Sequence, residues 1–434
     1  MHNSGWMLTG LYPGGIDAGE IGGRIPRAAV EEGEIALGHD GRVSSRALLR
    51  GLTGDEPGGP MTLAALSAAV KSGGFGGGVY LSGAWMPQEF AGAALLNTEG
   101  QPLAWSAAGG SSPEYAALSS TEAANPWLKG IRERIDLERA ALIPRSFVFD
   151  FMYTPGSELI EELLTELPGH LKVLPFREYE PDARETITPC PWRGAPLEQA
   201  RKIDKNDAEA GFIFGGGSGL RHLSNNGQPV SEGALAALLL LDLIRFREFK
   251  GRLIRHAAAP RIVDKAAQKL GVEIEECFGE IELSQRVAAS DALLGVLPGG
   301  RFVFPGPSPV PDSLQAALAL LELNSHTDLP PHLVLTEHLP EALEGGHAVS
   351  GLPLAPGSYG AEALAGSASA LIDQGLEELH SDGALAVFSR GEERLSLAIT
   401  LDGCAIEIRA DAADDASANK LAGQARNVLV RSVL

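Results

Sequence analysis

The sequence has 434 residues, and its 56 Asp and Glu against 35 Lys and Arg give a formal net charge of −21 at pH 7. This length predicts about two to four domains, and a hydrophobic content of 44% is typical of globular rather than disordered chains. The acidic charge argues against nucleic acid and anionic membranes as partners, because both need a basic binding face.

Other features narrow the class of protein further. The longest aliphatic run, 234–244, is interrupted by Asp242 and is well short of the roughly 20 residues that a membrane span needs. Cys190, Cys277 and Cys404 form no close pair, which argues against a disulfide framework and a cysteine-based zinc site. The N-terminus lacks a basic segment followed by an apolar one, so no secretory signal is expected. We therefore predict a cytoplasmic protein.

Short apolar runs alternate with segments of helical periodicity, which favours α/β units. In the first half of the chain, the predicted strands are 34–37, 78–81, 146–150 and 210–214. The predicted helices there are 44–52, 157–167 and 232–249. Ser44 is a candidate N-cap for the first of these helices. The last of them is apolar on most faces, so we expect it to be buried.

The second half of the sequence predicts one further α/β unit, a linker and a terminal unit. The unit comprises helix 260–270, strand 273–278, strands within 293–304 and helix 312–323. Residues 326–357 are rich in Pro, Gly and His and are interpreted as a linker. The terminal unit is predicted to hold helix 369–380, strands 384–389, 395–401 and 405–410, and a last helix. Its apolar/polar alternation predicts an antiparallel sheet with helices on one face.

Three local features could carry chemistry, and each has a simpler structural interpretation. The glycine loop 215–219 follows a strand and could hold phosphate through its N–H groups, but it has neither a Lys-Ser/Thr pair nor a G-x-G-x-x-G register. Ser218 lacks the spacing of a nucleophile elbow. The four histidines between 326 and 347 lack the helical i, i+4 spacing of metal ligands. We therefore prefer a tight turn as the interpretation of the glycine loop and a solvated linker as that of the histidine-rich segment.

Four segments, in order along the chain, resemble the α-D-phosphohexomutases, the family of phosphomannomutase and phosphoglucomutase. They are LGHDGRVSSRALLRGL (37–52), GVYLSGAWMPQEFAG (78–92), AGFIFGGGSGLRHLSNNGQPVSEGALAALLLLDLI (210–244) and GVLPGGRFVF (295–304). They correspond to the family's G-R-D-x-R-x-S-S turn, its phosphoserine loop, its D-G-D-x-D-R metal loop with the hairpin and helix that follow, and its sugar loop. The order and spacing of these segments cover nearly the whole chain.

The resemblance implies a four-domain α/β architecture, with three α/β domains and a C-terminal α+β domain. The implied domains are 1–143, with the phosphoserine-loop segment, 144–249, with the metal-loop segment, 250–345, with the sugar-loop segment, and 346–434, with a phosphate-loop segment. If the chain were an active member, it would be an isomerase of carbohydrate metabolism that moves a phosphoryl group within a sugar phosphate.

The catalytic positions of that family are replaced together. Ala84 stands at the phosphoserine position and has no oxygen to phosphorylate. Gly215, Gly217 and Gly219 stand at the metal-ligand positions, where Mg²⁺ would need carboxylate oxygens. In the sugar loop, Pro298 replaces the glutamate and Arg301 the histidine. The phosphate-loop segment, AITLDGC (398–404), lacks the family's arginine and paired hydroxyls.

These replacements predict a catalytically inactive protein of this fold with a binding, regulatory or assembly role. No cofactor is expected, and Mg²⁺ only if the chain is an active mutase. The alternatives are a sugar-phosphate-binding enzyme of altered chemistry and a divergent active mutase, for which Ser82 and Ser218 are the substitute hydroxyls.

The candidate partners are another protein, including an active paralogue, and a sugar phosphate. The candidate ligand-binding residues are Asp40, Arg42, Arg221 and Arg301, with His222 beside them. Ion pairing within the protein is the simpler interpretation of each arginine.

Trp85 and Met86 place a large apolar pair where the family has small polar groups. An apolar pair needs burial against something, so the two residues would plug the former active site or form a protein-docking surface. Packing into the core of the first domain is the structural alternative.

Overall fold

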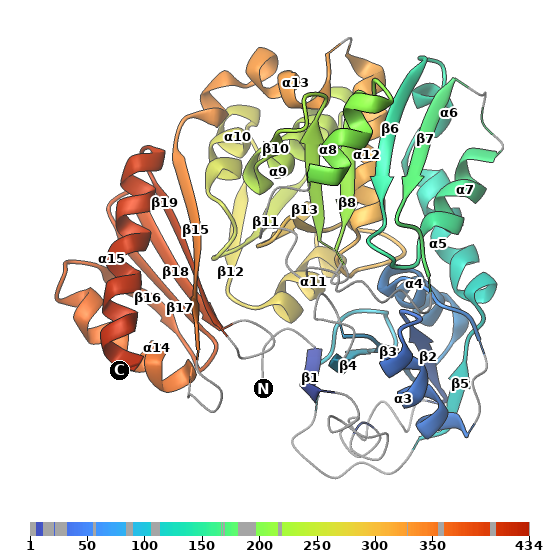
Figure 1. The fold of residues 1–434 in the computed structure, drawn as a ribbon, viewed down its shortest axis with the longest axis horizontal. Coiled ribbons are helices and arrows are strands. Elements are labelled where there is room, and N and C mark those ends of the chain that lie inside the picture. The colour runs from blue at the N-terminus through green and yellow to red at the C-terminus, as the bar shows by residue number, and fades with distance from the viewer. Residues whose placement is uncertain are drawn as a thin grey trace.

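The computed structural model describes residues 6–11, 21, 33–54, 58–83, 90–105, 113–165, 167, 170–180, 197–215, 219–327, 329–354, 360–399 and 405–433. Four sheets follow one another along the chain (Figure 1). The predicted boundaries at 143, 249 and 345 stay predictions.

The first two sheets share a mixed topology. The first has the order β1 (Trp6–Leu11), β4 (Phe90–Leu96), β3 (Gly77–Leu81), β2 (Ile35–His39), β5 (Tyr115–Ala117). The second has the order β10 (Pro229–Val230), β9 (Leu220–Ser224), β8 (Ala210–Phe214), β6 (Arg145–Asp150), β7 (Leu171–Phe176). In both sheets the central strands are parallel, and an antiparallel strand returns beside them.

The helices of this half are α3 (Val43–Thr53), α4 (Leu63–Gly73), α5 (Ser120–Arg134), α6 (Leu137–Ala140), α7 (Ser157–Thr165), α8 (Leu197–Lys205) and α9 (Glu232–Leu241). A capping box fixes the start of α5, where the Ser119 hydroxyl accepts from the Glu122 N–H and the Glu122 carboxylate accepts from the Ser119 N–H. Helix α9 is buried from Gly233 to Leu241, as its apolar sequence predicts. It continues as a π-helical segment, η1 (Asp242–Phe246), rather than as a regular helix to residue 249.

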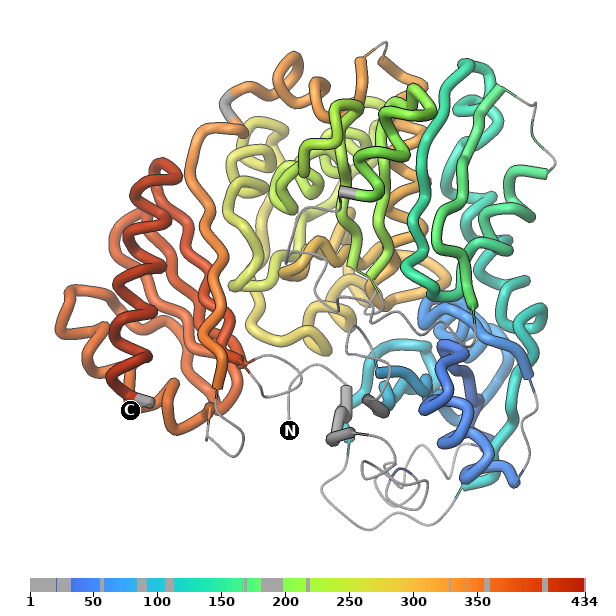
Figure 2. Tube along the Cα trace, viewed as in Figure 1, coloured from blue at the N-terminus to red at the C-terminus, as the bar shows by residue number. Residues whose placement is uncertain are grey.

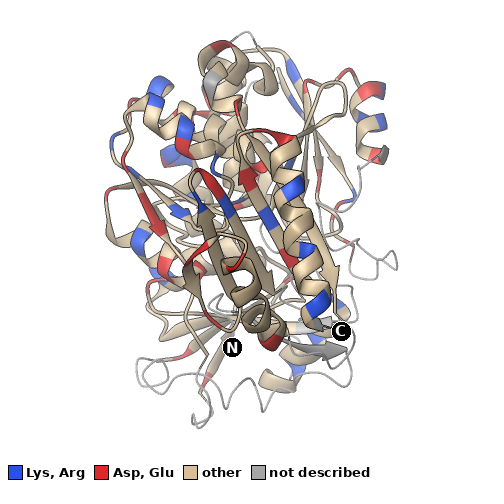
Figure 3. Cartoon of the chain, turned by 90° about the vertical axis from the view of Figure 1, so that its left-hand side faces the viewer, with Lys and Arg blue, Asp and Glu red and all other residues tan. Residues whose placement is uncertain are grey.

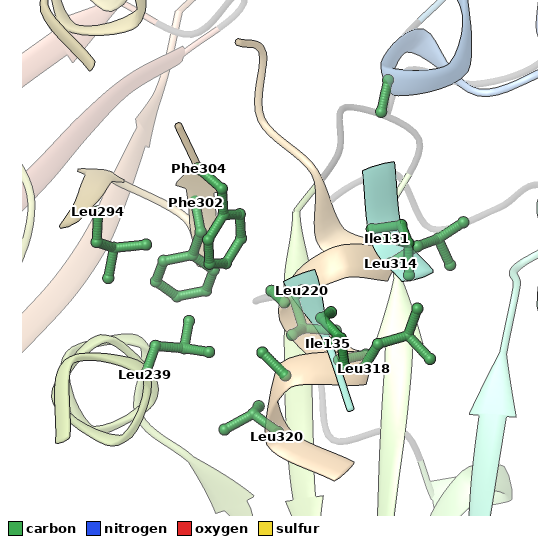
Figure 4. Packing of buried hydrophobic residues seen from close by; sticks show 14 of the residues in the cluster. Ile131, Ile135, Leu220, Leu239, Leu294, Phe302, Phe304, Leu314, Leu318 and Leu320 are labelled. Carbon is green, nitrogen blue, oxygen red and sulfur yellow. The ribbon is translucent and has the colours of Figure 1, made fainter. Parts of the chain in front are cut away.

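The third sheet has the order β12 (Ile274–Cys277), β11 (Arg252–His256), β13 (Ala292–Leu297), β14 (Arg301–Val303), with α10 (Ile262–Leu270), α11 (Glu280–Ala289) and α12 (Ser313–His326). One continuous apolar cluster joins the first three sheets, and it includes Ala36, Phe212 and Val296. Figure 4 shows part of it, where Phe302 and Phe304 lie beside Leu294 and Leu239.

The linker prediction for 326–357 is wrong. This segment contains α13 (Pro331–His338), the 3₁₀ helix η2 (Pro340–Leu343) and β15 (Gly346–Pro353). Val334 and Leu335 are buried, and β15 pairs with β19 (Ala405–Ala412) over eight residue pairs. Pro331 stands in the first turn of α13, where proline is compatible with a helix, so the proline-rich composition was misleading.

The fourth sheet is antiparallel throughout, as predicted, with the order β15, β19, β18 (Glu393–Ile399), β17 (Leu385–Arg390), β16 (Glu377–Ser381). Helices α14 (Gly360–Ile372) and α15 (Asp415–Val433) cover one face, where Ala386 and Phe388 are buried. The predicted helix 369–380 is wrong beyond Ile372, where α14 ends, because the chain turns at Gly375, which has a φ of +84°, and then forms β16. In Figure 2 this C-terminal unit lies beside the third sheet.

None of the helices in the described ranges is both long and apolar enough to span a membrane. Cys277, on β12, is a free and buried thiol, whereas Cys190 and Cys404 lie outside the described residues.

Candidate functional site

The predicted site is only partly within the described structure. Ala84, Trp85 and Met86 lie outside the described residues, and so do Gly217, Ser218 and residues 400–404. The predictions of a missing nucleophile and of an apolar contact surface therefore rest on the sequence. The described part holds Asp40, Arg42, Gly215, Gly219, Arg221 and Arg301.

Asp40 and Arg42 follow β2 and are bound to each other. The Arg42 Nε lies 3.1 Å from the Asp40 Oδ2, and the Arg42 N–H donates to Oδ1 over 3.1 Å. The Ser82 hydroxyl, at the end of β3, donates to the same carboxylate over 2.6 Å. Each of the three residues is at most 5% exposed. Asp40 thus serves as the acceptor of a buried internal network.

Tyr80 extends this network toward the start of α4. Its hydroxyl donates to the Met61 carbonyl over 2.8 Å. Burial raises the pKa of Tyr80 well above its usual value, and the nearby charge of Asp40 adds to the rise. Tyr80 is therefore a neutral hydrogen-bond donor and unsuited to act as a base at neutral pH.

A small cavity of about 40 Å³ lies beside this network. Its walls include Asp40 and Tyr80, residues 62–64 at the start of α4, residues 154–155, Phe214 and Gly215 at the end of β8, and residues 311–314 at the start of α12. One water molecule occupies about 30 Å³ in the liquid, and ligand pockets typically measure about 300–1,000 Å³. The described walls therefore leave space for water beside Asp40.

The loop at the metal-ligand positions closes as a hairpin between β8 and β9. The Gly215 N–H donates to the Gly219 carbonyl over 2.8 Å, and the Leu220 N–H donates to the Gly300 carbonyl over 2.8 Å. Glycine side chains offer no oxygen to a metal. No three His, Cys, Asp or Glu residues gather elsewhere in the described ranges in a way that could hold one. The glycines at the metal-ligand positions therefore offer Mg²⁺ no side-chain oxygen.

Glu232, at the first turn of α9, is bound on all sides by groups that recognise anions. Its Oε2 accepts from the N–H groups of Gly299 and Gly300, the latter over 2.8 Å. Its Oε1 accepts from the Arg409 guanidinium and lies 3.4 Å from the His347 Nε2. Burial by itself would raise the pKa of Glu232, but Arg409 and His347 together lower it to about 2. The carboxylate is therefore ionised and fully paired.

Gly300 shows how tightly the predicted sugar loop packs on its neighbour. Its φ is +65°, and a Cβ added there would lie 2.3 Å from the Leu220 carbonyl oxygen. Only glycine fits both the backbone conformation and the space. The loop is thus attached to the start of β9 and to Glu232, and two of its N–H groups are already hydrogen-bonded.

Arg301 is buried and pairs with Glu280, whose Oε2 lies 2.8 Å from its Nη1. Its Nε donates to the Pro298 carbonyl over 3.2 Å.

Arg221 is half-buried on β9. His222 is completely buried and stacks on Phe212 at 4.8 Å between ring centroids. Burial lowers its pKa to about 3, so His222 is a neutral residue of the core.

Charged contacts also connect the fourth sheet to the rest of the molecule. Besides Arg409 with Glu232, the Arg394 Nη2 lies 2.9 Å from the Glu276 Oε2, and the Arg261 N–H donates to Asp411 over 3.2 Å. In Figure 3, which looks onto this side, acidic and basic residues lie close together on the strands.

Sequence reasoning missed Glu232, Arg409 and His347. The acid after the Ser231 N-cap was visible, but its partners are distant in sequence.

No protein-family model matches the chain, and no curated protein matches its sequence. Solved structures do match. A phosphoglucomutase/phosphomannomutase family protein of Burkholderia thailandensis has a TM-score of 0.73 at 17% identity, over 99% of this chain and 96% of that one. Paramecium parafusin, a phosphoglucomutase, has a TM-score of 0.69 at 14% identity, over 93% and 89%. The N-acetylphosphoglucosamine mutase of Aspergillus fumigatus has a TM-score of 0.55 at 12% identity, over 86% and 92%.

The chain therefore has the multi-domain α/β fold of the phosphohexomutases, as its sequence predicts. Because these identities are low, the likeness establishes the fold and leaves activity to be argued from the residues.

Proposed function

We propose that this protein is a catalytically inactive phosphohexomutase-fold protein with a binding, regulatory or assembly role. The observation that carries the proposal is the internal carboxylate of Glu232. In this chain, two N–H groups of the sugar-loop segment, an arginine and a histidine converge on Glu232. Groups of these kinds bind a phosphate or carboxylate ligand when they face an open cleft.

The sequence supports the same proposal independently. Ala84 cannot carry a phosphoryl group, and the three glycines cannot hold Mg²⁺ by side chains. Loss of one stabilising donor costs several kcal/mol of barrier. Loss of both the nucleophile and the metal removes phosphoryl transfer altogether.

An activity assay tests the proposal directly. The purified full chain is assayed with glucose 1-phosphate and mannose 1-phosphate, in the presence of Mg²⁺ and a hexose bisphosphate activator. We expect no turnover above the buffer blank. Turnover that co-purifies with the protein would overturn the proposal. Ser82→Ala and Ser218→Ala would then show whether either hydroxyl is the nucleophile.

The second candidate function is an altered enzyme that binds a sugar phosphate. The Ser82 hydroxyl donates a hydrogen bond of 2.6 Å to Asp40, and this observation favours the second candidate. A serine next to a basic group such as a carboxylate can be activated as a nucleophile. Calorimetry with glucose 1-phosphate separates the two candidates. An inactive protein that acts through a protein partner predicts no heat of binding, whereas the altered enzyme predicts binding that Arg301→Ala weakens.

The partner of an inactive protein is a separate question. Purification from the native source followed by mass spectrometry is expected to show one dominant partner protein, with an active paralogue as the candidate. A bound sugar phosphate in place of a protein would favour the second candidate. The cytoplasmic location expected from the sequence stays a prediction.

A further inference from the structure

A cavity of about 170 Å³ lies away from all the predicted site residues, between the C-terminal end of α5, the segment η1 and the segment after β14. Its lining includes three basic residues, Arg134, Arg247 and Lys250, and one amide, Gln315. The remaining lining residues are Ile135, Leu243, Phe249, Ala292, Leu293, Phe304, Pro305 and Ala319. Ile135 and Phe304 belong to the apolar cluster drawn in Figure 4.

Two of the three basic groups at this cavity lack an acidic partner within the described ranges. Arg134 and Lys250 form no ion pair with any residue in the described ranges. Glu133 is next to Arg134 in sequence, but it is 64% exposed and pairs with Lys129. Such a cluster is unexpected in a chain with a net charge of −21.

Arg247 is only weakly balanced by the acids behind it. Its Nη1 lies 3.7 Å from the Asp242 Oδ2 and 3.5 Å from the Glu322 Oε2. Burial raises the pKa of Asp242 to about 8, and Glu322 adds to the rise, so Asp242 is uncharged at neutral pH. Glu322 is thus left as one buried acid facing Arg247, while the cavity has three cations.

The geometry also keeps Arg134 in place. Its guanidinium lies over Gly306, where an added Cβ would be 2.6 Å from the Arg134 Nε. The Arg134 backbone carbonyl accepts a hydrogen bond from the Arg247 guanidinium, which brings the two cations together. Like charges held side by side lower the pKa of Arg134, after the larger effect of burial. An anion between them would relieve that repulsion.

The apolar lining of the cavity selects an apolar body. Phe304 and Leu293 belong to this lining, and the Phe249 ring lies under the Arg247 guanidinium, 4.7 Å from its central carbon. Phe249 is 44% exposed, which leaves the mouth accessible. The Gln315 side chain, although the residue is only 4% exposed, makes no hydrogen bond within the described ranges and can donate into the cavity. A dry cavity of about 150 Å³ is known to hold a benzene molecule. The space therefore fits one aromatic ring.

We propose that this cavity binds a small carboxylate with an apolar body of about one aromatic ring, with its carboxylate held by Arg134 and Arg247 and its ring against Phe304 and Leu293. An arginine pair recognises a carboxylate through charge-assisted hydrogen bonds. The site does not depend on the proposed function, because it shares no residue with the Glu232 or Asp40 networks.

Calorimetric titration of the full chain with benzoate tests this proposal, with benzamide as the uncharged probe and acetate as the probe without a ring. We expect saturable binding of benzoate, and affinities at least about tenfold weaker for benzamide and for acetate. Arg134→Gln should weaken benzoate binding by about tenfold as well. Equal binding of benzoate and benzamide, or no benzoate binding, would overturn the assignment.

Arg132→Gln is the matched control, because Arg132 lies on the same helix, is exposed, and pairs with Glu162 away from the cavity. It should bind benzoate as the wild-type chain does. Ala319→Leu should block the cavity and abolish binding, with circular dichroism used to confirm that the variant is folded. If Arg132→Gln and Arg134→Gln weaken benzoate binding equally, the effect is one of net charge and the site is refuted.

Discussion

Asp242 is the residue whose environment conflicts most with its charge. It is completely buried, neither of its carboxylate oxygens has a hydrogen-bond partner within the described ranges, and the nearest guanidinium nitrogen is 3.7 Å away. Burial and the neighbouring Glu322 raise its pKa from 3.8 to about 8. The folded state therefore keeps a proton that the unfolded chain releases, and the free energy of unfolding falls as pH rises from about 4 to about 8.

We expect Asp242→Asn to remove this pH dependence. The variant should be more stable than the wild-type chain by about 1–3 kcal/mol at pH 7, because the amide has no proton to lose. The gain should shrink toward zero near pH 4. Urea unfolding at several pH values measures it, with the exposed Asp373→Asn as the control. A gain that is the same at pH 4.5 and pH 8 would contradict the assignment of the shift to Asp242.

At the level of elements, two glycines of the C-terminal unit have opposite surroundings. Gly346 begins β15, and a Cβ added there would lie 2.0 Å from the backbone of Asp414. Gly423 lies within α15, and an added Cβ would meet nothing within 4 Å. The first position needs a glycine for space, whereas the second only weakens its helix.

Gly346→Ala should therefore lower the free energy of unfolding by about 1–3 kcal/mol, because backbone must move to make room. Gly423→Ala should raise it by up to about 1 kcal/mol through the helix propensity of alanine. Thermal and urea unfolding of the two variants beside the wild-type chain measure both effects. If both substitutions are stabilising, β15 does not pack at the start of α15 as described.

The elements also show what sequence could predict. Strand 210–214 is confirmed with the predicted bounds, because a short apolar run between a helix and a glycine cluster has few other structures. Residues 326–357 were misinterpreted because composition outweighed the pairing of β15 with a strand about 60 residues later. Glu232 shows the same limit at the site. Its partner Arg409 is 177 residues away, and no local pattern encodes that contact.

At the level of the whole molecule, the described residues form one large apolar core and a smaller, separate one. The first three sheets share one cluster, whereas the fourth has a separate one, which includes Phe388, Ile406 and Leu429. The apolar contact between the third and fourth sheets is small and comprises Ala257, Ala258, Leu385 and Val387, with Phe278 and Ala398 packed against it. The fourth sheet is therefore attached mainly through charged groups.

His347 makes this attachment dependent on pH. Burial would lower its pKa, but hydrogen bonds to Asp411 and Glu232 raise it from 6.5 to about 9. A histidine whose pKa is higher in the folded state stabilises that state fully below pH 6.5, and the contribution is lost as pH rises through about 9. At neutral pH the protonated ring therefore binds the fourth sheet to Glu232.

We expect two thermal transitions by calorimetry, with the C-terminal unit melting first, because its core is separate from the larger one. Raising the pH from 7 to 10, or the salt to about 1 M, should lower the first transition more than the second, since both weaken the charged contacts. Glu232→Gln should do the same, because it removes the carboxylate that binds Arg409 and His347 and leaves the buried Arg409 paired with Glu407 alone. Hydrogen exchange should then increase in β15 and β19 before it does in β8. A single transition that responds equally to pH, salt and Glu232→Gln would show that the fourth sheet unfolds with the other three.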